Sequence, residues 1–438
     1  MNLNTFKQLR HQVYQCYERS ADALFELGDA LSSEAEARSL PELSLSPFFR
    51  RQWASVYEAL EDGRSDEQRW MSVWATALLA EHTGPVWISI DSTSIARPEA
   101  NTSPDRGMIY VPNLPHASKP VSVGWQFSTV MLLPEQPSSW GAILSQRRIS
   151  TAEAAVSVGV QQVEALRPLL PASTRLLADR WYGSGPFLQA CQRLRLGALI
   201  RLKRNRKLYR PAPAHPPGKR GAPRKDGDLF QGSRPETWAE PDASWNGTDW
   251  HGKPLAEQAW QPLHVQQARE VEVTVFRVLR EGANGTKRDP RESWFVWVGE
   301  QELAPSEVAV SYRYRFSHEH SYRFLKQDLL WTKVHVRTPE QFERWSLVVA
   351  TAMNQLVLAR SLGLASYRPW ERRRDRVTPR QVRRVMAGIL PQVGTPARVP
   401  KPRGKSPGRP NGATVSKATR FAVVRKPKPV PKKPRKKA

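Results

Sequence analysis

SEVAVSYRYRFSHEHSYRFLKQDLL, residues 306–330, has the pattern of one charged helix. Pro305 precedes it, and Ser306 can accept hydrogen bonds from the free N–H groups of a first turn. Four residues follow one another at intervals of three, four and seven, which places them on one stripe of an α-helix: Tyr312, Arg315, Glu319 and Lys326. A stripe of a phenol, two cations and a carboxylate is unsuited to a hydrophobic core. It is either a solvated face or part of a polar site.

Two aspartates upstream of this stretch follow predicted strands. Residues 86–90, VWISI, form a short apolar run that ends at Asp91, and residues 174–178, TRLLA, end at Asp179. Open α/β sheets place their sites at the carboxyl ends of central strands. The alternatives are a turn residue at Asp91, where Asp-Ser-Thr is good turn chemistry, and simple pairing of Asp179 with Arg180. Asp105 is an alternative to Asp91, but no predicted strand comes directly before it.

The remaining pattern predicts an α/β fold with additions at both ends. Residues 1–84 have helical periodicity and form a small helical domain that either binds DNA ends or only caps the next domain. Residues 85–370 alternate strands and helices into a mixed sheet, with a β-rich insertion at about residues 203–300. A further helix is expected over 371–395, and 396–438 is a basic, proline-rich tail that we expect to be disordered.

Charge and composition restrict the class of partner. The chain has 438 residues, with 67 Lys plus Arg against 41 Asp plus Glu, a formal net charge of +26. Such an excess favours nucleic acid, because released counterions drive that association. Its two cysteines, Cys16 and Cys191, cannot build a disulfide framework or a Cys-rich zinc site, and no long apolar run indicates a signal peptide or membrane span. We therefore expect a cytoplasmic protein with no membrane partner.

The pattern Tyr, two residues, Arg, three residues, Glu, six residues, Lys resembles the signature of one group of insertion-sequence cut-and-paste transposases. The resemblance covers about residues 85–365. It implies a ribonuclease H-like catalytic domain of the Asp-Asp-Glu (DDE) class, with Asp91, Asp179 and Glu319 as catalytic residues and metal ligands. Two Mg²⁺ ions, with Mn²⁺ able to substitute, would be held by these hard oxygen ligands. The implied reactions are cleavage of DNA at transposon ends and transfer of the 3′-hydroxyl to target DNA.

The resemblance also implies DNA contacts and a bacterial, nucleoid-associated setting. Tyr312, Arg315 and Lys326 would contact phosphates near the cleaved strand. A tryptophan of the insertion would stack on a flipped base, and Trp294 aligns with that position a little better than Trp297. The expected partner is double-stranded DNA, both transposon ends and target, bound by a homodimer.

Two other functions stay open. A ribonuclease H-like nuclease without strand transfer would use the same three acids, but it gives no reason for the Tyr, Arg and Lys of the stripe. A non-catalytic DNA-binding protein descended from a transposase would need only the basic segments. A zinc site at His318 and His320 is disfavoured, because residues two apart on a helix point in different directions.

Overall fold

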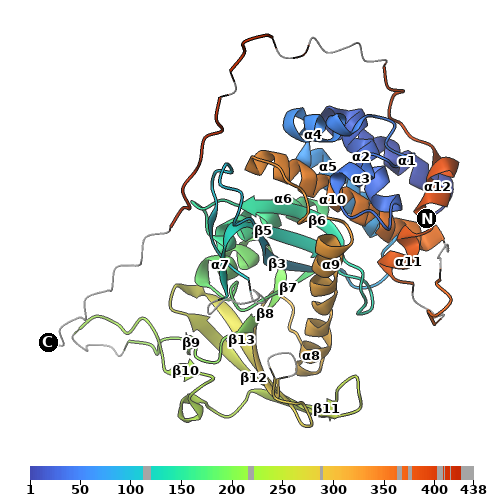
Figure 1. Cartoon of the computed structure of the whole chain (residues 1–438). Helices are drawn as coiled ribbons and strands as arrows, with labels where there is room; N and C mark the ends of the chain where they lie inside the picture. The colour runs from blue at the N-terminus through green and yellow to red at the C-terminus, as the bar shows by residue number, and fades with distance from the viewer. Residues whose placement is uncertain are drawn as a thin grey trace.

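The computed structural model describes residues 1–111, 120–215, 221–286, 290–362, 367–372, 377–401, 408, 410–414 and 416–425. Figure 1 shows a group of helices on one side of a central sheet and a second group of strands on the other side. Helices α8 and α9 connect these two regions along one edge. The sheet and its covering helices confirm the α/β class predicted from the sequence.

The N-terminal region is helical, as its periodicity predicts, with one small β-ribbon. Its elements are α1 (Leu3–Tyr14), β1 (Tyr17–Arg19), α2 (Ala21–Ser33), α3 (Leu40–Leu43), α4 (Trp53–Asp62), β2 (Arg64–Ser65) and α5 (Glu67–Ala80). These helices share one hydrophobic core with the sheet and with α10 (Pro339–Ala359) rather than forming a core of their own. This packing is compatible with both predicted roles of the N-terminal helices, a cap on the sheet and a DNA-binding domain.

The central sheet is mixed, and two of its strand pairs are parallel. Its elements are β3 (Trp87–Ala96), β4 (Gly107–Tyr110), β5 (Val121–Leu132), β6 (Ala142–Ile149), α6 (Ala155–Leu166), β7 (Arg175–Ala178), α7 (Gly185–Arg193) and β8 (Gly197–Leu202). Strand β7 lies parallel between β3 and β8, whereas β5 runs antiparallel to both β3 and β6. The pairing of β3 with β7 ends at Ile90 opposite Ala178, so Asp91 and Asp179 are the next residues of two neighbouring strands.

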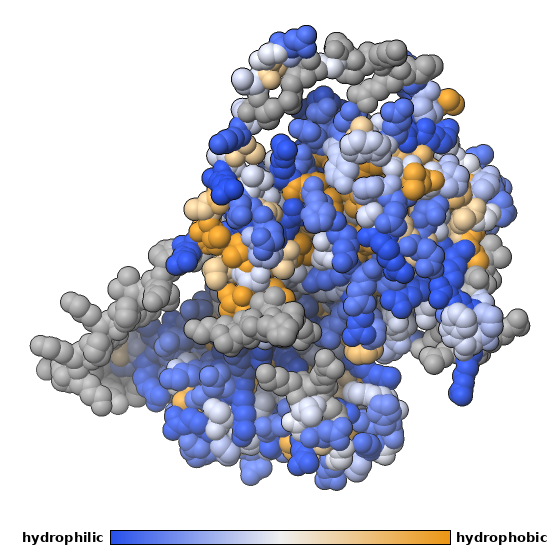
Figure 2. All heavy atoms as spheres, in the orientation of Figure 1, coloured by the Kyte–Doolittle hydropathy of each residue, from blue (hydrophilic) through white to orange (hydrophobic). Residues whose placement is uncertain are grey.

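The predicted insertion is a set of antiparallel strands that extends the same sheet. It comprises β9 (Lys207–Tyr209), β10 (Leu229–Gln231), β11 (Ala243–Thr248), β12 (Pro254–Val265), β13 (Ala268–Arg280) and β14 (Glu292–Val298). Strand β14 joins it to the central sheet through antiparallel pairing with β8. The face of the insertion seen in Figure 2 is mostly hydrophilic. Its apolar residues instead face the core and α8 (Pro305–Arg313).

One carboxyl group is buried where the insertion packs on α8. The Glu257 side chain of β12 is fully buried and accepts a hydrogen bond of 3.2 Å from the backbone N–H of Ala309. Its second oxygen, Oε2, has no hydrogen-bond partner among the described residues. Burial raises the pKa of Glu257 to about 8, and the Ala309 N–H opposes this only in part. The group therefore holds a proton in the folded protein at neutral pH.

This protonation predicts a pH-dependent stability difference for Glu257→Gln. The unfolded chain releases the proton near pH 4, so between about pH 5 and 9 the folded state binds more protons and loses stability as pH rises. Glutamine keeps the polar contact without ionising. The variant should match the wild type near pH 5 and exceed its free energy of unfolding by roughly 1–3 kcal/mol near pH 9. Chemical denaturation at both pH values measures this. Glu272→Gln, at an exposed position of β13, should show no such pH-dependent gain.

The charged stretch is not one continuous helix. Helix α8 ends at Arg313, and α9 (Phe316–Gln327) begins after a tight turn in which Arg315 N–H bonds to Tyr312 O at 3.2 Å. Tyr312 therefore lies on α8, while Arg315 is the residue before α9. The expectation of a single four-residue stripe on one helix is wrong in this respect. The turn aims the Arg315 guanidinium into the sheet, where carboxylates meet it.

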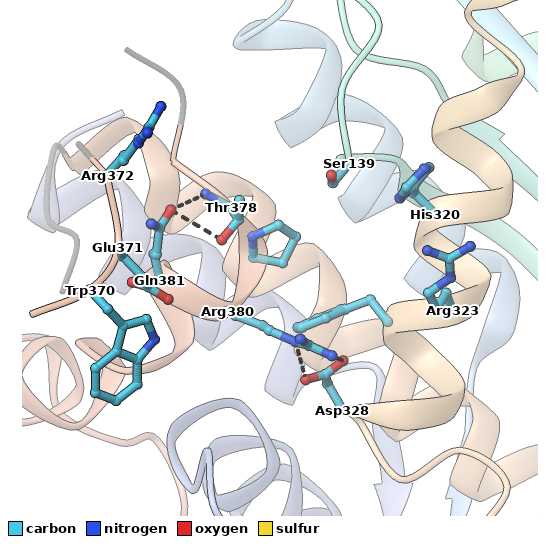
Figure 3. Close-up of a pocket in the computed structure, with 12 residues that line it drawn as sticks. Ser139, His320, Arg323, Asp328, Trp370, Glu371, Arg372, Thr378, Arg380 and Gln381 are labelled. Atoms are coloured by element: carbon cyan, nitrogen blue, oxygen red, sulfur yellow. Dashed lines mark hydrogen bonds and ion pairs between the residues drawn. The ribbon is translucent and has the colours of Figure 1, made fainter. Parts of the chain in front are cut away.

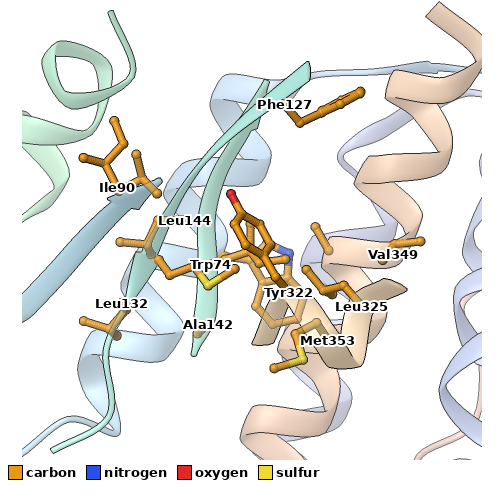
Figure 4. Packing of buried hydrophobic residues seen from close by; sticks show 14 of the residues in the cluster. Trp74, Ile90, Phe127, Leu132, Ala142, Leu144, Tyr322, Leu325, Val349 and Met353 are labelled. Atoms are coloured by element: carbon orange, nitrogen blue, oxygen red, sulfur yellow. The ribbon is translucent and has the colours of Figure 1, made fainter. Parts of the chain in front are cut away.

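Helices α9 and α10 both contribute side chains to the hydrophobic core. Figure 4 shows residues of α5, β3, β5 and β6 packed against α9 and α10, with Tyr322 and Leu325 of α9 among them. The C-terminal helix predicted over 371–395 is two short helices, α11 (Pro379–Arg383) and α12 (Met386–Val393). Within the described ranges, no helix combines the length and the apolar character that crossing a bilayer requires.

Part of the basic tail contacts the sheet. The N–H groups of Phe421 and Val424 donate to Asn101 O at 2.9 Å and Arg106 O at 2.8 Å, beside β4. The sequence predicts no such contact. Residues 112–119 of the loop after Asp91 and residues 426–438 of the tail lie outside the described residues.

Candidate active site

Strand β3 presents an unusual stripe of polar side chains to α9. Successive residues of a strand point to opposite faces, so Ser89, Asp91 and Thr93 share one face. Each of them meets a residue of the charged stretch. Ser89 Oγ lies 2.6 Å from His318 Nδ1, Asp91 Oδ2 accepts from Arg315, and Thr93 Oγ1 accepts from Lys326 Nζ at 2.6 Å. Asp91 thus lies within β3 rather than at its end, and the stripe fixes α9 over it.

Arg315 joins two of the predicted catalytic acids. Its Nη2 donates to Asp91 Oδ2 at 2.6 Å, and its Nη1 donates to Glu319 Oε1 at 2.7 Å. The side chain of Arg315 is 11% exposed and that of Asp91 is 18% exposed, whereas Glu319 is 57% exposed. The guanidinium therefore lies between a nearly buried carboxylate and one that is open to solvent.

The charges of the site influence one another strongly. Burial raises the pKa of Asp91; Arg315 opposes this shift, and the negative charge of Asp179 adds to it. For Arg315, burial is the largest single cause and works to lower the pKa, but the combined attraction of Asp91, Tyr312, Asp179 and Glu319 outweighs it, so the pKa rises. Each of the three acids thus acts electrostatically on Arg315, and two of them, Asp91 and Glu319, bond to it directly.

Asp179 directly follows β7, as predicted, and two local contacts fix its backbone. Its carbonyl accepts the N–H of Tyr182 at 2.9 Å, which closes a turn. The hydroxyl of Tyr312 reaches Ala178 O at 3.4 Å, so α8 lies beside the end of β7. The Tyr312 ring packs on Phe295 with a centroid separation of 4.7 Å, and burial raises the pKa of Tyr312 to about 12.

Lys326 and Tyr322 hold α9 against β3 beyond the acids. Lys326 Nζ donates to Thr93 Oγ1 and to Ser94 O at 3.0 Å, and burial lowers its pKa to about 8, although Asp91 opposes this shift. Tyr322 OH donates to the backbone carbonyl of Asp91 at 2.9 Å. The sequence analysis did not single out Tyr322, and it considered His318 only as a zinc ligand. The alternating polar residues of ISIDSTS were the available signal for a partner on that face.

Comparison with known proteins shows the family of the chain. The family model of the DDE superfamily endonucleases matches residues 12–269, more than half of the chain. The chain belongs to this family. The match includes Asp91 and Asp179 and ends before Glu319, so the third acid depends on the contacts just described. No curated protein matches the chain.

Membership of the DDE endonucleases makes the chain a transposase-like nuclease that acts on DNA, and its mixed sheet is the ribonuclease H-like fold of that class. The family implies a divalent metal ion. Among the described residues, no three His, Cys, Asp or Glu side chains are already gathered around a metal position. The donors nevertheless fit such an ion. They are carboxylates, the Arg315 guanidinium bridges Asp91 and Glu319 as a cation would, and Asp179 follows the strand that pairs with β3.

Trp294 has a different environment from the one a base-stacking residue needs. Its side chain is 4% exposed on β14, and its ring packs on Trp260 and Trp238 at centroid separations of 5.8 and 5.2 Å. These contacts make it a core residue of the insertion, as does the burial of Trp297. Base stacking by Trp294 stays a prediction, and its burial speaks against it.

A basic hollow continues along the outer side of α9. It encloses about 530 Å³, and Figure 3 shows His320 and Arg323 pointing into it from α9. On its far side Arg380 pairs with Asp328 at 2.6 Å, and the ring of Trp370 is 74% exposed. The lining carries three arginines against two acids, Asp328 and Glu371, which leaves a small excess of positive charge near Glu319.

The Arg315 bridge predicts a metal-dependent stability difference for Arg315→Gln. Removing the guanidinium leaves Asp91 without its counter-ion, so the free energy of unfolding should fall by about 1–3 kcal/mol. Mg²⁺ or Mn²⁺ should restore more of this loss in the variant than it adds to the wild type, because ligands that bind the folded state stabilise it. Thermal unfolding with and without metal measures both effects. Arg323→Gln, which alters an exposed arginine two turns further along α9, is the matched control. An equal metal response in all three proteins would contradict the bridge.

Proposed function

We propose that this DDE endonuclease is a transposase that binds the two ends of a DNA element, cuts them in the presence of Mg²⁺ and transfers the freed 3′-hydroxyl to target DNA. The observation that carries the proposal is the position of the four signature residues. Tyr312 contacts the end of β7, Arg315 contacts Asp91, and Lys326 contacts β3. Glu319 accepts a hydrogen bond from the same Arg315. A nuclease that only hydrolyses DNA has no need for this set.

Each residue has a role that follows from its chemistry. Asp91, Asp179 and Glu319 would hold two Mg²⁺ ions, with Mn²⁺ as a substitute. When bound, such ions activate a water or hydroxyl nucleophile and stabilise the leaving oxygen. Arg315 can turn from the carboxylates to a DNA phosphate, for which its planar fork is well suited. Lys326 and Tyr312 would contact neighbouring phosphates.

The charge of the chain supports a long DNA contact. The net charge of +26 includes fourteen Lys or Arg in residues 401–438, which have no acid. We propose that the tail and the basic hollow of α9 bind DNA regardless of sequence, and that the N-terminal helices bind the ends of the element. We further propose a homodimer that holds two ends together, acting in the bacterial cytoplasm at the nucleoid.

The test is an assay that separates cutting from joining. The full chain is incubated with Mg²⁺, DNA that spans the sequences flanking its gene, and a supercoiled target plasmid. A transposase yields cut ends and also joined products in which labelled 3′ ends are covalently attached to the plasmid. Cleavage without joined products would instead establish a nuclease without strand transfer. DNA binding without either product would indicate a non-catalytic DNA-binding protein.

A further inference from the structure

Arg383, the last residue of α11, is a buried cation whose partners are backbone carbonyls. Its guanidinium donates to Leu31 O at 3.0 Å, Glu34 O at 2.7 Å and Asp328 O at 2.8 Å. Among the described residues, no carboxylate forms an ion pair with it. Burial lowers the pKa of Arg383 to about 10, although the charges of Asp328 and Glu34 oppose this shift. Removing a cation from water costs free energy, which the three carbonyl bonds offset.

The three carbonyls belong to the ends of two helices. Leu31 lies in the last turn of α2 and Glu34 directly follows that helix, whereas Asp328 directly follows α9. The last carbonyls of an α-helix have no partner within the helix, and they carry partial negative charge. Arg383 supplies donors at both ends. One side chain thus joins a helix of the N-terminal region to the helix that carries Glu319.

The side chain of Asp328 is held by the same short helix. Arg380 donates from Nε and Nη2 to the two carboxylate oxygens at 2.6 and 2.9 Å, as Figure 3 shows. Residues three apart share one face of a helix, so Arg380 and Arg383 act from the same side of α11. We call α11 with these two arginines the α11 clamp. It contacts the end of α9 through both the carbonyl and the carboxylate of Asp328.

The α11 clamp is itself fixed in the main core. Val382 of α11 and Met386, the first residue of α12, are fully buried there. Val377 O, just before α11, accepts a hydrogen bond of 2.8 Å from Trp140 Nε1. Helix α12 packs on α1 and α2, and Figure 1 shows it beside the N-terminal helices. The clamp therefore keeps a fixed position relative to the N-terminal helices and the sheet.

The end of α9 has an unfavourable backbone conformation that needs such support. Leu330 has a φ of 54°, in the left-handed region that suits glycine, and Trp331 N–H bonds back to Leu325 O at 3.0 Å. A residue with a side chain persists in this region only where surrounding contacts fix it. Arg383 provides such contacts at Asp328, two residues earlier. The point at which α9 ends therefore depends on tertiary contacts.

We propose that Arg383 is a positioning residue for the DDE centre. By bonding the end of α9 to the end of α2, it fixes α9 along and around its axis, and with it the places of Glu319 and Lys326. Lys326 lies two residues before Asp328, and Glu319 lies about two turns further back on the same helix. The N-terminal helices then contribute to cleavage through α9. This proposal rests on the proposed function, since it assumes that Glu319 is a catalytic acid.

Hydrogen–deuterium exchange of the full chain, without DNA or metal, tests the clamp independently of cleavage. Arg383→Gln should raise exchange by about tenfold or more in two places at once, the last turn of α2 and the last turn of α9. Arg380→Gln should raise it at α9 alone, because the bonds of Arg380 go to Asp328. Arg383→Lys should be intermediate, since an ammonium keeps the charge but lacks the planar fork that reaches three carbonyls.

Arg167→Gln is the matched control. Arg167 donates to Leu194 O at 2.9 Å and to Leu170 O at 3.1 Å, so it also caps a helix end, but that of α7 rather than α9. Its substitution should leave exchange in α2 and α9 unchanged. Circular dichroism gives the folded fraction of every variant. If Arg383→Gln does not fold, Arg383→Lys carries the test, with smaller effects in the same direction.

Cleavage kinetics on saturating DNA separate positioning from stability. Per folded molecule, Arg383→Gln should cut DNA about 10- to 100-fold more slowly, with the affinity for DNA within about threefold of the wild type. Arg383→Lys should recover part of the rate, and Arg167→Gln should keep all of it. A residue that only stabilises the fold would lower the folded fraction and leave the rate per folded molecule unchanged.

The outcomes distinguish this proposal from the proposed function. Unchanged exchange at the end of α9 in Arg383→Gln, or an unchanged rate per folded molecule, would show that Arg383 does not position the centre. If exchange and rate change as expected but the wild type forms no joined products, Arg383 keeps its role in a nuclease and the transposase proposal fails. If the wild type cuts no DNA, the proposed function fails, and exchange alone decides whether Arg383 joins α2 to α9.

Discussion

Asp91→Asn should lower the rate of DNA cleavage by about a thousandfold or more, with the affinity for DNA unchanged within about threefold. Asparagine keeps the shape of the side chain but loses the charge that would hold a metal ion. The affinity for DNA should not fall, because the change removes a negative charge from a surface that would contact DNA phosphates. The equivalent changes Asp179→Asn and Glu319→Gln should have the same effect, because we propose that all three carboxylates hold the same metal ions. Cleavage rates and binding isotherms on the same labelled DNA measure this.

Asp105→Asn is the control for that experiment. Asp105 bonds to Arg148 and to Thr151, so it stabilises the sheet away from the acids. The variant should retain cleavage within about threefold once its folded fraction is taken into account. Loss of cleavage in Asp105→Asn together with normal cleavage in Asp91→Asn would reverse the assignment of the first acid.

Asp29→Ala should lower the free energy of unfolding by about 3–5 kcal/mol, the largest stability effect we expect from a single change. Arg10 Nη1 and Nη2 donate to the two Asp29 oxygens at 2.7 and 2.8 Å, with side chains only 2% and 3% exposed. Arg10 also bonds to Gln355 of α10 and to Gly394 O beyond α12. Removing Asp29 leaves a buried guanidinium without its counter-ion at the point where four segments meet.

Asp62→Ala provides the comparison for Asp29→Ala. The Arg19–Asp62 pair spans 3.6 Å with side chains 59% and 57% exposed, and such pairs contribute about 0–1 kcal/mol. Chemical denaturation of the three proteins measures the difference. Similar small losses in both variants would show that the N-terminal helices are not tied to the core as the contacts indicate.

The α/β class and the approximate position of the insertion could be predicted because they depend on local patterns. Apolar runs such as residues 86–90 and 174–178 form strands in any fold that buries them, and Asp179 could be placed at a strand end for the same reason. Asp91 was misplaced because Asp-Ser-Thr is also turn chemistry. In the structure β3 continues to Ala96, and α9 covers its polar face.

What the sequence could not supply are features created by tertiary contact. No glycine or proline lies at the break between α8 and α9. The break occurs at Arg315, whose side chain bonds to Asp91, 224 residues away in the sequence. The burial of Trp294 and the exposure of Trp181 likewise depend on how the insertion folds onto β8. Both tryptophans lie in short segments next to polar residues, and local pattern does not distinguish them.

We propose that Asp91, Asp179 and Glu319 form one metal centre that acts on DNA. The most direct measurement is a crystal structure of the full chain with Mn²⁺ and a DNA end, in which anomalous scattering locates the ions. We predict peaks bound by these three carboxylates, with Arg315 moved from Asp91 to a DNA phosphate. Ions bound elsewhere, or a DNA strand that lies far from the three acids, would contradict the account.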